Sequence, residues 1–325
     1  MTLRPITDGV VTIRSPEPGD TVALIAGHDD ESRRWLGRAD IEPKPAAVIV
    51  HDGEVAGWVD YDDEREWLLP GEVNIGYGVV PGCRGRGYAT RAVQLLVHHL
   101  ALNTAVHTGT LLIHRDNARS LAVASRLDFV PRGDIDDSRY FKRRLPIFPY
   151  TDGSITIRKL GVEDIDMDLA AKDDEQIDWL WEPGHREHWE SMSSGEQREH
   201  ALRGLEQSNA SFGAGPKWSF AVDARDVEYA AYVDCDLANP HVPNGEANIS
   251  YSAHPEQRGK GYVSRGVLLV TRFLRDNTGA GEAHILVDVD NAASLRVARA
   301  VGAVERERYV NRQGRTMVRH VIALR

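Results

Sequence analysis

The sequence has few cysteines and no long apolar run. Only Cys83 and Cys235 occur among 325 residues, too few and too far apart for a disulfide framework or a cysteine metal site. No stretch approaches the roughly 18 consecutive apolar residues of a membrane-spanning helix, and Met1–Val10 lacks the apolar core of a signal peptide. We therefore expect a cytoplasmic protein without a membrane partner.

An excess of basic residues is also absent. The chain has 39 Lys and Arg residues against 49 Asp and Glu residues, and its formal net charge is −10. Such a charge repels nucleic acid and weakly favours a cationic partner such as a protonated amine. We expect no nucleic-acid partner, and the charge gives only a hint of a cationic substrate.

Several catalytic motifs are missing. No third glycine follows Gly87 to complete a dinucleotide-binding loop, no Gly-Lys pair precedes Ser or Thr, and no Gly-x-Ser-x-Gly elbow of a hydrolase occurs. His185-x-x-His188 has glutamates nearby but no third ligand in pattern, so we expect no metal.

What the sequence does contain is an internal repeat. Thr12–Arg14 reappears 144 residues later as Thr156–Arg158, and Glu72–Tyr77 reappears 174 residues later as Glu246–Tyr251. The second copy therefore carries 30 extra residues. Self-similarity over this length predicts two domains of common origin.

The domains are predicted at residues 1–147 and 148–325, with the insertion at about 182–216. The joint lies near Pro146–Pro149, where two prolines bar regular structure. Two duplicated domains on a short linker favour an intramolecular pseudo-dimer, in a chain that is itself a monomer or a homodimer.

Hydrophobic periodicity predicts the same elements in each copy. In the first, Val73–Val80 and Thr110–His114 are strands, and Tyr88–Leu100 has apolar residues at helical spacing. His51–Glu54 is typical of a hairpin turn, and Asn117 stands where a helix N-cap belongs. Strands followed by helices favour an open α/β (α+β) sheet.

Between strand and helix, each copy carries a loop of glycines and cations. It reads Arg84-Gly85-Arg86-Gly87-Tyr88-Ala89 in the first copy and Arg258-Gly259-Lys260-Gly261-Tyr262-Val263 in the second. Glycines let the backbone approach a ligand closely, and N–H groups at a helix N-terminus point at an anion. The cations raise the local positive potential, which suits a pyrophosphate.

The arrangement resembles the GNAT superfamily of acyl-CoA-dependent N-acyltransferases. The hallmark of that family, Arg/Gln-x-x-Gly-x-Gly/Ala between a splayed central strand and a helix, corresponds here to Arg84–Ala89. Asn117-x-x-Ser120 follows, and the same signature recurs from Asn291, so both copies look most like the ribosomal-protein N-terminal acetyltransferase branch. The resemblance implies acetyl-CoA as co-substrate and, in each half, a mixed, mostly antiparallel sheet with flanking helices.

The resemblance also implies which residues contact the coenzyme, namely the splayed strand, the loop, the first helical turn and the next helix cap. These are Val79, Val80, Arg84, Gly85, Arg86, Gly87, Tyr88, Ala89, Thr90 and Asn117 in the first copy, and Ala253, His254, Arg258, Gly259, Lys260, Gly261, Tyr262, Val263, Ser264 and Asn291 in the second.

Catalysis in the family is direct attack of a neutral amine on the thioester, with a strand N–H as oxyanion donor. Asn74 and Asn248 occupy the frequent position of the catalytic Glu. Glu72 and Glu246, two residues earlier on the same strand face, are therefore the candidate bases, acting through water. Carboxylates that merely open a strand are an equal alternative.

The frequent Tyr acid of the family is also replaced, by Ala124 and Ala298. Ser120 and Ser294 are the candidate groups that hydrogen-bond the CoA sulfur. Alternatively, they only satisfy backbone N–H groups in the first helical turn. Trp35 and Trp179 recur beside apolar residues and indicate core or a wall of the acceptor pocket.

Acidic residues at strand ends either recognise a cationic acceptor or face solvent in turns. They are Asp60, Asp62, Asp63 and Glu64 in the first copy and Asp234 and Asp236 in the second.

The two loops are unequal, because Val263 replaces the final Gly/Ala of the hallmark and would crowd a pyrophosphate. The sequence therefore predicts an acetyl-CoA-dependent N-acetyltransferase that acts on a protein N-terminus or a small amine. A non-catalytic acyl-CoA binding or sensing protein, or one active and one degenerate half, are the alternatives.

Overall fold

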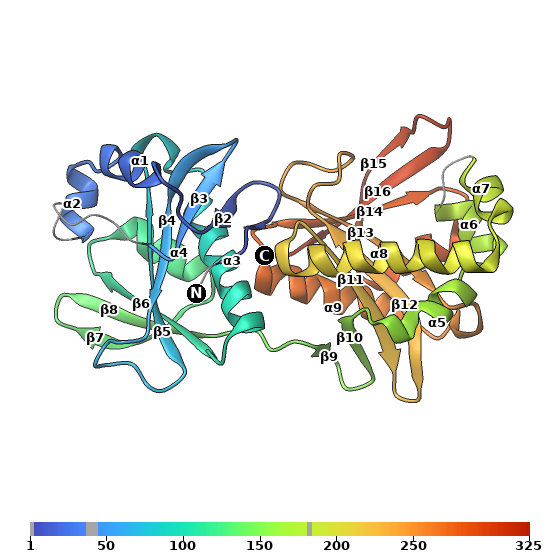
Figure 1. Ribbon diagram of the computed structural model, residues 1–325, viewed down its shortest axis with the longest axis horizontal. Helices are drawn as coiled ribbons and strands as arrows, with labels where there is room; N and C mark the ends of the chain where they lie inside the picture. Colours follow the sequence, from blue (N-terminus) through green and yellow to red (C-terminus); the bar gives the residue numbers. More distant parts are fainter. Residues whose placement is uncertain (1–2, 37–44, 181–183) are drawn as a thin grey trace. The chain divides into compact units, whose positions relative to one another are not determined.

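The computed structural model describes residues 3–36, 45–180 and 184–325. The chain forms two compact units, one made of Met1–Phe148 with Asp276–Gly279 and the other of Pro149–Arg275 with Ala280–Arg325. Within the described residues, each unit contains one eight-stranded sheet with flanking helices (Figure 1).

The first sheet has the strand order β1-β2-β3-β4-β5-β6-β8-β7. Its strands are β1 (Ile6–Thr7), β2 (Thr12–Arg14), β3 (Ala47–His51), β4 (Glu54–Asp62), β5 (Glu72–Val79), β6 (Thr108–His114), β7 (Val130–Ile135) and β8 (Ser138–Arg144). The helices of this unit are α1 (Asp20–Ala26), α2 (Asp30–Leu36), α3 (Tyr88–Asn103) and α4 (Ala118–Arg126).

The second sheet has the equivalent order β15-β16-β14-β13-β12-β11-β10-β9. Its strands are β9 (Tyr150–Thr151), β10 (Ile155–Lys159), β11 (Lys217–Ala224), β12 (Val227–Asp236), β13 (Ala247–Ala253), β14 (Glu282–Asp288), β15 (Val304–Val310) and β16 (Thr316–Ala323). The helices are α5 (Ile165–Ala170), α6 (Asp174–Leu180), α7 (His185–Ser191), α8 (Ser194–Ala214), α9 (Tyr262–Asn277) and α10 (Ala292–Ala300).

One strand pair in each sheet separates soon after it forms. β5 runs parallel to β6, but only Glu72–Asn74 pair with Thr108–Thr110. In the second unit, only Ala247 and Asn248 of β13 pair with β14. The described neighbours are otherwise antiparallel, so the predicted mixed α/β sheet with a splayed central strand is confirmed.

The core of the first unit lies between the sheet and α3. Val59 of β4 and Val73 and Ile75 of β5 are buried in one cluster with Leu95 and Leu96 of α3. The predicted helix and strands of this region are confirmed within a few residues of their predicted ends. Strand alternation places the even-numbered residues of β5 on the opposite face of the sheet.

The predicted hairpin between β3 and β4 is also present. Asp52 and Gly53 have φ angles of 50° and 81°, the two left-handed residues of a type I′ turn.

The segment predicted as an insertion contains α7 and α8. The side chain of Ser193 caps α8 by accepting a hydrogen bond from the backbone N–H of Glu196. The carboxylate of Glu196 in turn accepts the backbone N–H of Ser193, which completes a capping box. α8 runs beside β11 (Figure 1). The ring of Phe212 on α8 lies 5.6 Å from the ring of Phe220 on β11. The insertion therefore adds a helical layer to the second unit.

Candidate functional site

The glycine loop joins β5 to α3 through a 3₁₀ turn at Pro81–Cys83. Gly85 and Gly87 have φ angles of 79° and 80°, and Gly259 and Gly261 have 77° and 80°. These left-handed conformations disfavour any side chain. A Cβ placed at any of the four positions would meet no heavy atom within 4 Å. The loop is an open cradle with the same backbone in both units.

The cradle ends at the N-terminus of a long helix. Gly87 is the N-cap of α3 and no side chain caps it, and the first helical hydrogen bond runs from Arg91 N–H to Gly87 C=O. The N–H groups of Tyr88–Thr90 therefore have no helical acceptor, and the positive end of the helix dipole lies beside them. Arg265 and Gly261 repeat this arrangement in α9. Such a terminus binds anions.

The unpaired edge of the splayed strand borders the cradle. Val80 N–H donates to Ala56 C=O at 2.9 Å, within the sheet, and His254 N–H makes the equivalent bond at 3.1 Å. Hydrogen-bonding groups alternate along an antiparallel strand, so the N–H groups of Val79 and Ala253 point into the gap. Of each predicted pair, Val79 and Ala253 are therefore the residues whose N–H groups face the gap.

A family profile described as "Acetyltransferase (GNAT) domain" matches the chain twice, over residues 6–130 and 154–304. The chain belongs to the GNAT acetyltransferase family. The two matched segments lie in the two compact units, so the protein consists of two tandem GNAT domains.

Several solved GNAT structures are similar to about half of this chain. The ribosomal L7/L12 alpha-N-protein acetyltransferase RimL, in complex with coenzyme A, has 15% identity and a TM-score of 0.44, over 55% of this chain and 98% of its own. The microcin C7 self-immunity acetyltransferase MccE, in complex with acetyl-CoA and AMP, has 16% identity and a TM-score of 0.41, over 53% and 93%. A spermidine N-acetyltransferase SpeG chimera from Vibrio cholerae and hSSAT has 17% identity and a TM-score of 0.40, over 53% and 96%. No curated protein matches the sequence.

The side chains of the GNAT loop contribute less to the cradle than the backbone does. Tyr88 is 5% exposed and its ring lies 4.7 Å from that of His51, and Thr90 is also buried. Arg86 is exposed, and Lys260 Nζ donates to Gln257 Oε1 at 2.7 Å. Arg86 and Lys260 can therefore supply positive potential beside the cradle.

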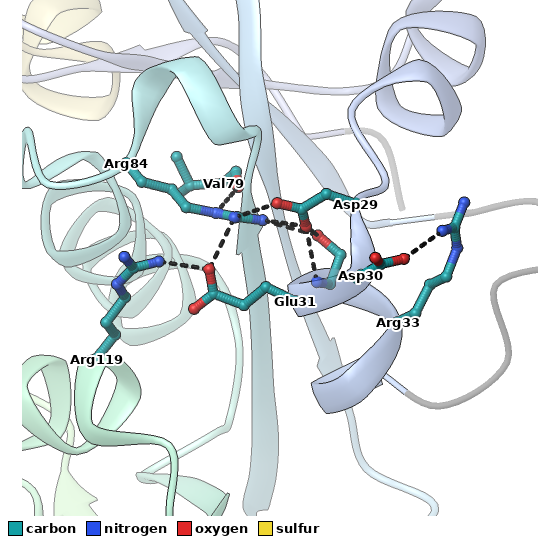
Figure 2. A network of polar contacts seen from close by, with 8 residues as sticks. Asp29, Asp30, Glu31, Arg33, Val79, Arg84 and Arg119 are labelled. Atoms are coloured by element: carbon teal, nitrogen blue, oxygen red, sulfur yellow. Dashed lines mark hydrogen bonds and ion pairs between the residues drawn. The ribbon is translucent and has the colours of Figure 1, made fainter.

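The two loop arginines form ion pairs with acidic residues at the start of a short helix, α2 in the first unit and α6 in the second. Arg84 pairs with Asp29 and Glu31 at the start of α2, as Figure 2 shows. Arg258 pairs in the same way with acidic residues at the start of α6. The sequence predicted both arginines as coenzyme contacts and gave no indication of these partners.

Both predicted bases are engaged in contacts within the fold. Glu72 is 7% exposed and accepts hydrogen bonds from Lys142 Nζ at 2.5 and 2.8 Å and from Leu69 N–H at 3.2 Å. Burial raises the pKa of Glu72, but these hydrogen bonds outweigh it and bring the pKa below its ordinary value. Glu246 accepts the backbone N–H of Gly281 at 2.8 Å. This geometry gives both carboxylates a structural role and weighs against their use as bases.

Asn117 is the predicted N-cap of the next helix. Its Oδ1 accepts the backbone N–H of Ser120 at 3.1 Å. In the second unit, Oδ1 of Asn291 accepts the backbone N–H of Ser294 at 2.9 Å and caps α10. These capping bonds engage only the amide oxygen and do not use the Nδ2 group.

A tyrosine that sequence reasoning missed lies at the same place. The hydroxyl of Tyr77 donates to the backbone oxygen of Ser120 at 3.4 Å, and Tyr251 does the same to Ser294 at 3.3 Å. Burial raises the pKa of each tyrosine to about 12. The only sequence signal was the Ile-x-Tyr stretch that both copies share.

Asp60 lies within β4 on the face opposite α3 and is not a solvated turn residue. Its carboxylate accepts Ala46 N–H at 3.0 Å, and burial raises its pKa. Trp58 lies two positions earlier on the same face, and a Cβ at Gly78 would come within 2.5 Å of its Nε1, so the indole covers the backbone of β5. Asp234 is the counterpart in β12, where burial also raises the pKa.

The repeated tryptophans border the ends of the parallel strands. The ring of Trp35 lies 5.4 Å from that of His114, the last residue of β6. Trp179 lines a small cavity together with Asn291 and Ser294. The placement of Trp179 agrees with a pocket wall.

Among the residues that the structure describes, no three His, Cys, Asp or Glu side chains are grouped so that they could hold a metal ion. No described helix is both long enough and apolar enough to cross a membrane.

Proposed function

We propose that the protein transfers an acetyl group from acetyl-CoA to a primary amine, by direct attack of the amine on the thioester. The observation that carries this proposal is the open cradle at the start of α3, beside the unpaired edge of β5. A pyrophosphate held by the N–H groups of Tyr88–Thr90 would direct the pantetheine arm along that edge. Membership of the GNAT family supports acetyl-CoA as the donor.

The transition state has a negative oxygen and a departing thiolate. The N–H of Val79 faces the gap and is the proposed oxyanion donor. With a pKa of about 12, Tyr77 stays protonated at neutral pH and can donate its proton to the thiolate, after which water restores it. The hydroxyl of Ser120 supplies a second hydrogen bond to the sulfur.

The amine must lose a proton before it attacks. Asp60 is the proposed group that binds the ammonium and takes its proton through water. Its carboxylate lies on the same face of β4 as Trp58 and is partly desolvated, which raises its pKa and makes it a better base. The net charge of −10 favours a cationic acceptor. The Asn-x-x-Ser signature favours a protein N-terminus, and a polyamine or an amino sugar has the same reacting group.

The second unit has the same parts in a less favourable form. Lys217 Nζ lies 3.5 Å from the carboxylate of Asp234, and Val263 replaces the small residue of the hallmark. We therefore propose that the first unit is the more active one. The binding or sensing function is the alternative, favoured by the structural contacts of Glu72 and Glu246.

Tryptophan substitutions test these assignments. Gly87→Trp and Gly261→Trp fill the two cradles. Gly53→Trp and Gly314→Trp are matched controls, because these glycines have φ angles of 81° and 76° and equally open surroundings but lie in hairpin turns. Thiol release from acetyl-CoA is measured with spermidine, an amino sugar and a dipeptide, and CoA binding is measured by calorimetry.

We expect Gly87→Trp to abolish most thiol release and one equivalent of CoA binding, while both controls keep both. Binding without turnover of any amine would make the protein a binding module. Loss of turnover only in Gly261→Trp would make the second unit the active one.

A further inference from the structure

The guanidinium of Arg84 has no donor left for a phosphate. Its Nε donates to Val79 C=O at 3.1 Å, and one terminal nitrogen donates to Asp29 Oδ2 at 2.6 Å and Glu31 Oε2 at 2.9 Å. The other terminal nitrogen donates to Asp29 Oδ1 at 2.8 Å, as Figure 2 shows, and to Ser32 Oγ at 2.9 Å. An arginine has five N–H donors, and these five bonds use them all.

The second unit repeats the contact. Arg258 donates to Asp173 at 2.6 Å and to Glu175 at 2.8 Å, at the start of α6. In both units the hydrogen bonds from the arginine hold the pKa of an aspartate, Asp29 or Asp173, below its ordinary value. Each loop arginine therefore reaches the same place in its own domain.

The first unit has an additional link. Arg119 of α4 donates to Glu31 at 2.6 Å, so α2 is held both to the glycine loop and to the helix that Asn117 caps (Figure 2). The equivalent position in the second unit is Ala293. The link to α4 is thus specific to the first unit.

The helices held in this way carry the repeated tryptophans. Trp35 of α2 contacts His114 at the end of β6, and Trp179 of α6 lines the cavity with Asn291 and Ser294. Arg84 therefore connects the loop, the edge of β5 and the helix that carries Trp35. Arg258 connects the second loop to the helix that carries Trp179.

We propose that Arg84 and Arg258 are positioning residues that hold the acceptor-side helix beside the coenzyme loop, and that they are not side-chain ligands of the pyrophosphate. The proposal rests on the proposed function for the roles of loop and wall. A bidentate arginine suits this task because its planar fork fixes direction as well as distance. The loop then binds pyrophosphate through its backbone.

The two roles of Arg84 predict different effects of Asp29→Asn on CoA affinity. If Arg84 were a phosphate ligand restrained by Asp29, this substitution would release it and tighten CoA binding, whereas Arg84→Gln would weaken it. If Arg84 positions α2, both substitutions loosen α2 and leave CoA binding nearly unchanged. Arg84→Lys keeps the charge but not the fork and is expected to be intermediate.

The first measurement is hydrogen exchange, which needs no turnover. We expect the peptide of residues 29–36 to exchange at least about tenfold faster in Arg84→Gln and in Asp29→Asn than in the unmodified protein, while residues 88–103 stay unchanged. Arg33→Gln is the matched control, because it removes an exposed ion pair to Asp30 from the same helix. Arg258→Gln should act likewise on residues 173–180.

The second measurement separates the two substrates. We expect Kd for CoA, measured by calorimetry, to change by less than about twofold, and KM for the fastest amine of the panel to rise about tenfold in both variants. Unchanged exchange at residues 29–36, or a large loss of CoA affinity in Arg84→Gln with a gain in Asp29→Asn, would overturn the proposal. If no amine is turned over, the proposed function fails, and hydrogen exchange and CoA affinity still decide the role of Arg84.

Discussion

Nζ of Lys142 lies 2.5 Å from Oε1 of Glu72, across the strand that separates them. Lys142 is on β8 and Glu72 begins β5, and β6 lies between these strands. The ion pair therefore ties β5 to β8 at the level where β5 and β6 are still paired, next to the point at which they separate.

Glu72→Gln should reduce stability more than catalysis. We expect a loss of about 2 kcal/mol at pH 7, because a buried charged hydrogen-bonding group is removed. The folded-state pKa of Glu72 is lowered, so its contribution is present above the unfolded pKa of about 4.3 and is lost as pH falls through the folded value. Chemical unfolding at pH 7 and pH 3 checks this, with the exposed Glu54→Gln as control. A stable variant without turnover would restore Glu72 as the base.

Tyr77→Phe should lower kcat by about 100-fold, because it removes the proposed acid. Among the described residues, the hydroxyl hydrogen-bonds only the backbone oxygen of Ser120, so the fold should change little. Steady-state kinetics at saturating acetyl-CoA measure the effect, and Tyr61→Phe on β4 is the control. An equal effect of both variants would argue against a specific role of Tyr77.

Asp60→Asn should stabilise the protein at neutral pH and impair acetyl transfer. Burial raises the folded pKa of Asp60, so its contribution is most favourable below the unfolded pKa and is lost as pH rises through the folded value. The gain in Tm over the unmodified protein should therefore shrink toward pH 3. The exposed Asp63→Asn should change neither property. Full activity of Asp60→Asn would exclude it as the ammonium partner.

The difference between the two loops can be reversed. Val263→Ala should increase CoA affinity of the second site by about threefold to tenfold, and Ala89→Val should lower that of the first site by a similar factor, corresponding to roughly 1 kcal/mol. Calorimetry on a Gly87→Trp background isolates the second site, and a Gly261→Trp background isolates the first. Equal affinities would show that the branched side chain does not crowd the ligand.

The fold could be predicted from the sequence because the internal repeat contains the sequence signals of each strand and helix twice. The stretch Glu72–Tyr77 and its copy Glu246–Tyr251 marked the central strands, and Asn117 and Asn291 marked two helix caps through local rules. These signals depend on neighbours within a few residues, which the sequence displays directly.

The partners of the site residues were not accessible in this way. Arg84 meets Asp29 from 55 positions away and Glu72 meets Lys142 from 70 positions away, so each pairing depends on the strand order. The choice between Val79 and Val80 as N–H donor needed the register of β4 against β5. The role proposed for Tyr77 was not predictable from the sequence, because its hydroxyl contacts Ser120 of α4 only in the folded chain.

The separation of β5 from β6, and of β13 from β14, divides the sheet of each domain into two leaves. In the first unit, strands β1 to β5 form one leaf and β6, β8 and β7 form the other. The leaves are joined where Glu72–Asn74 pair with Thr108–Thr110 and by the ion pair between Lys142 and Glu72. A molecule bound between the leaves would contact both of them and hold them together where the strands do not pair. Ligand occupancy would then determine how cooperatively each domain unfolds, so that the two halves of one chain could differ in rigidity without differing in fold.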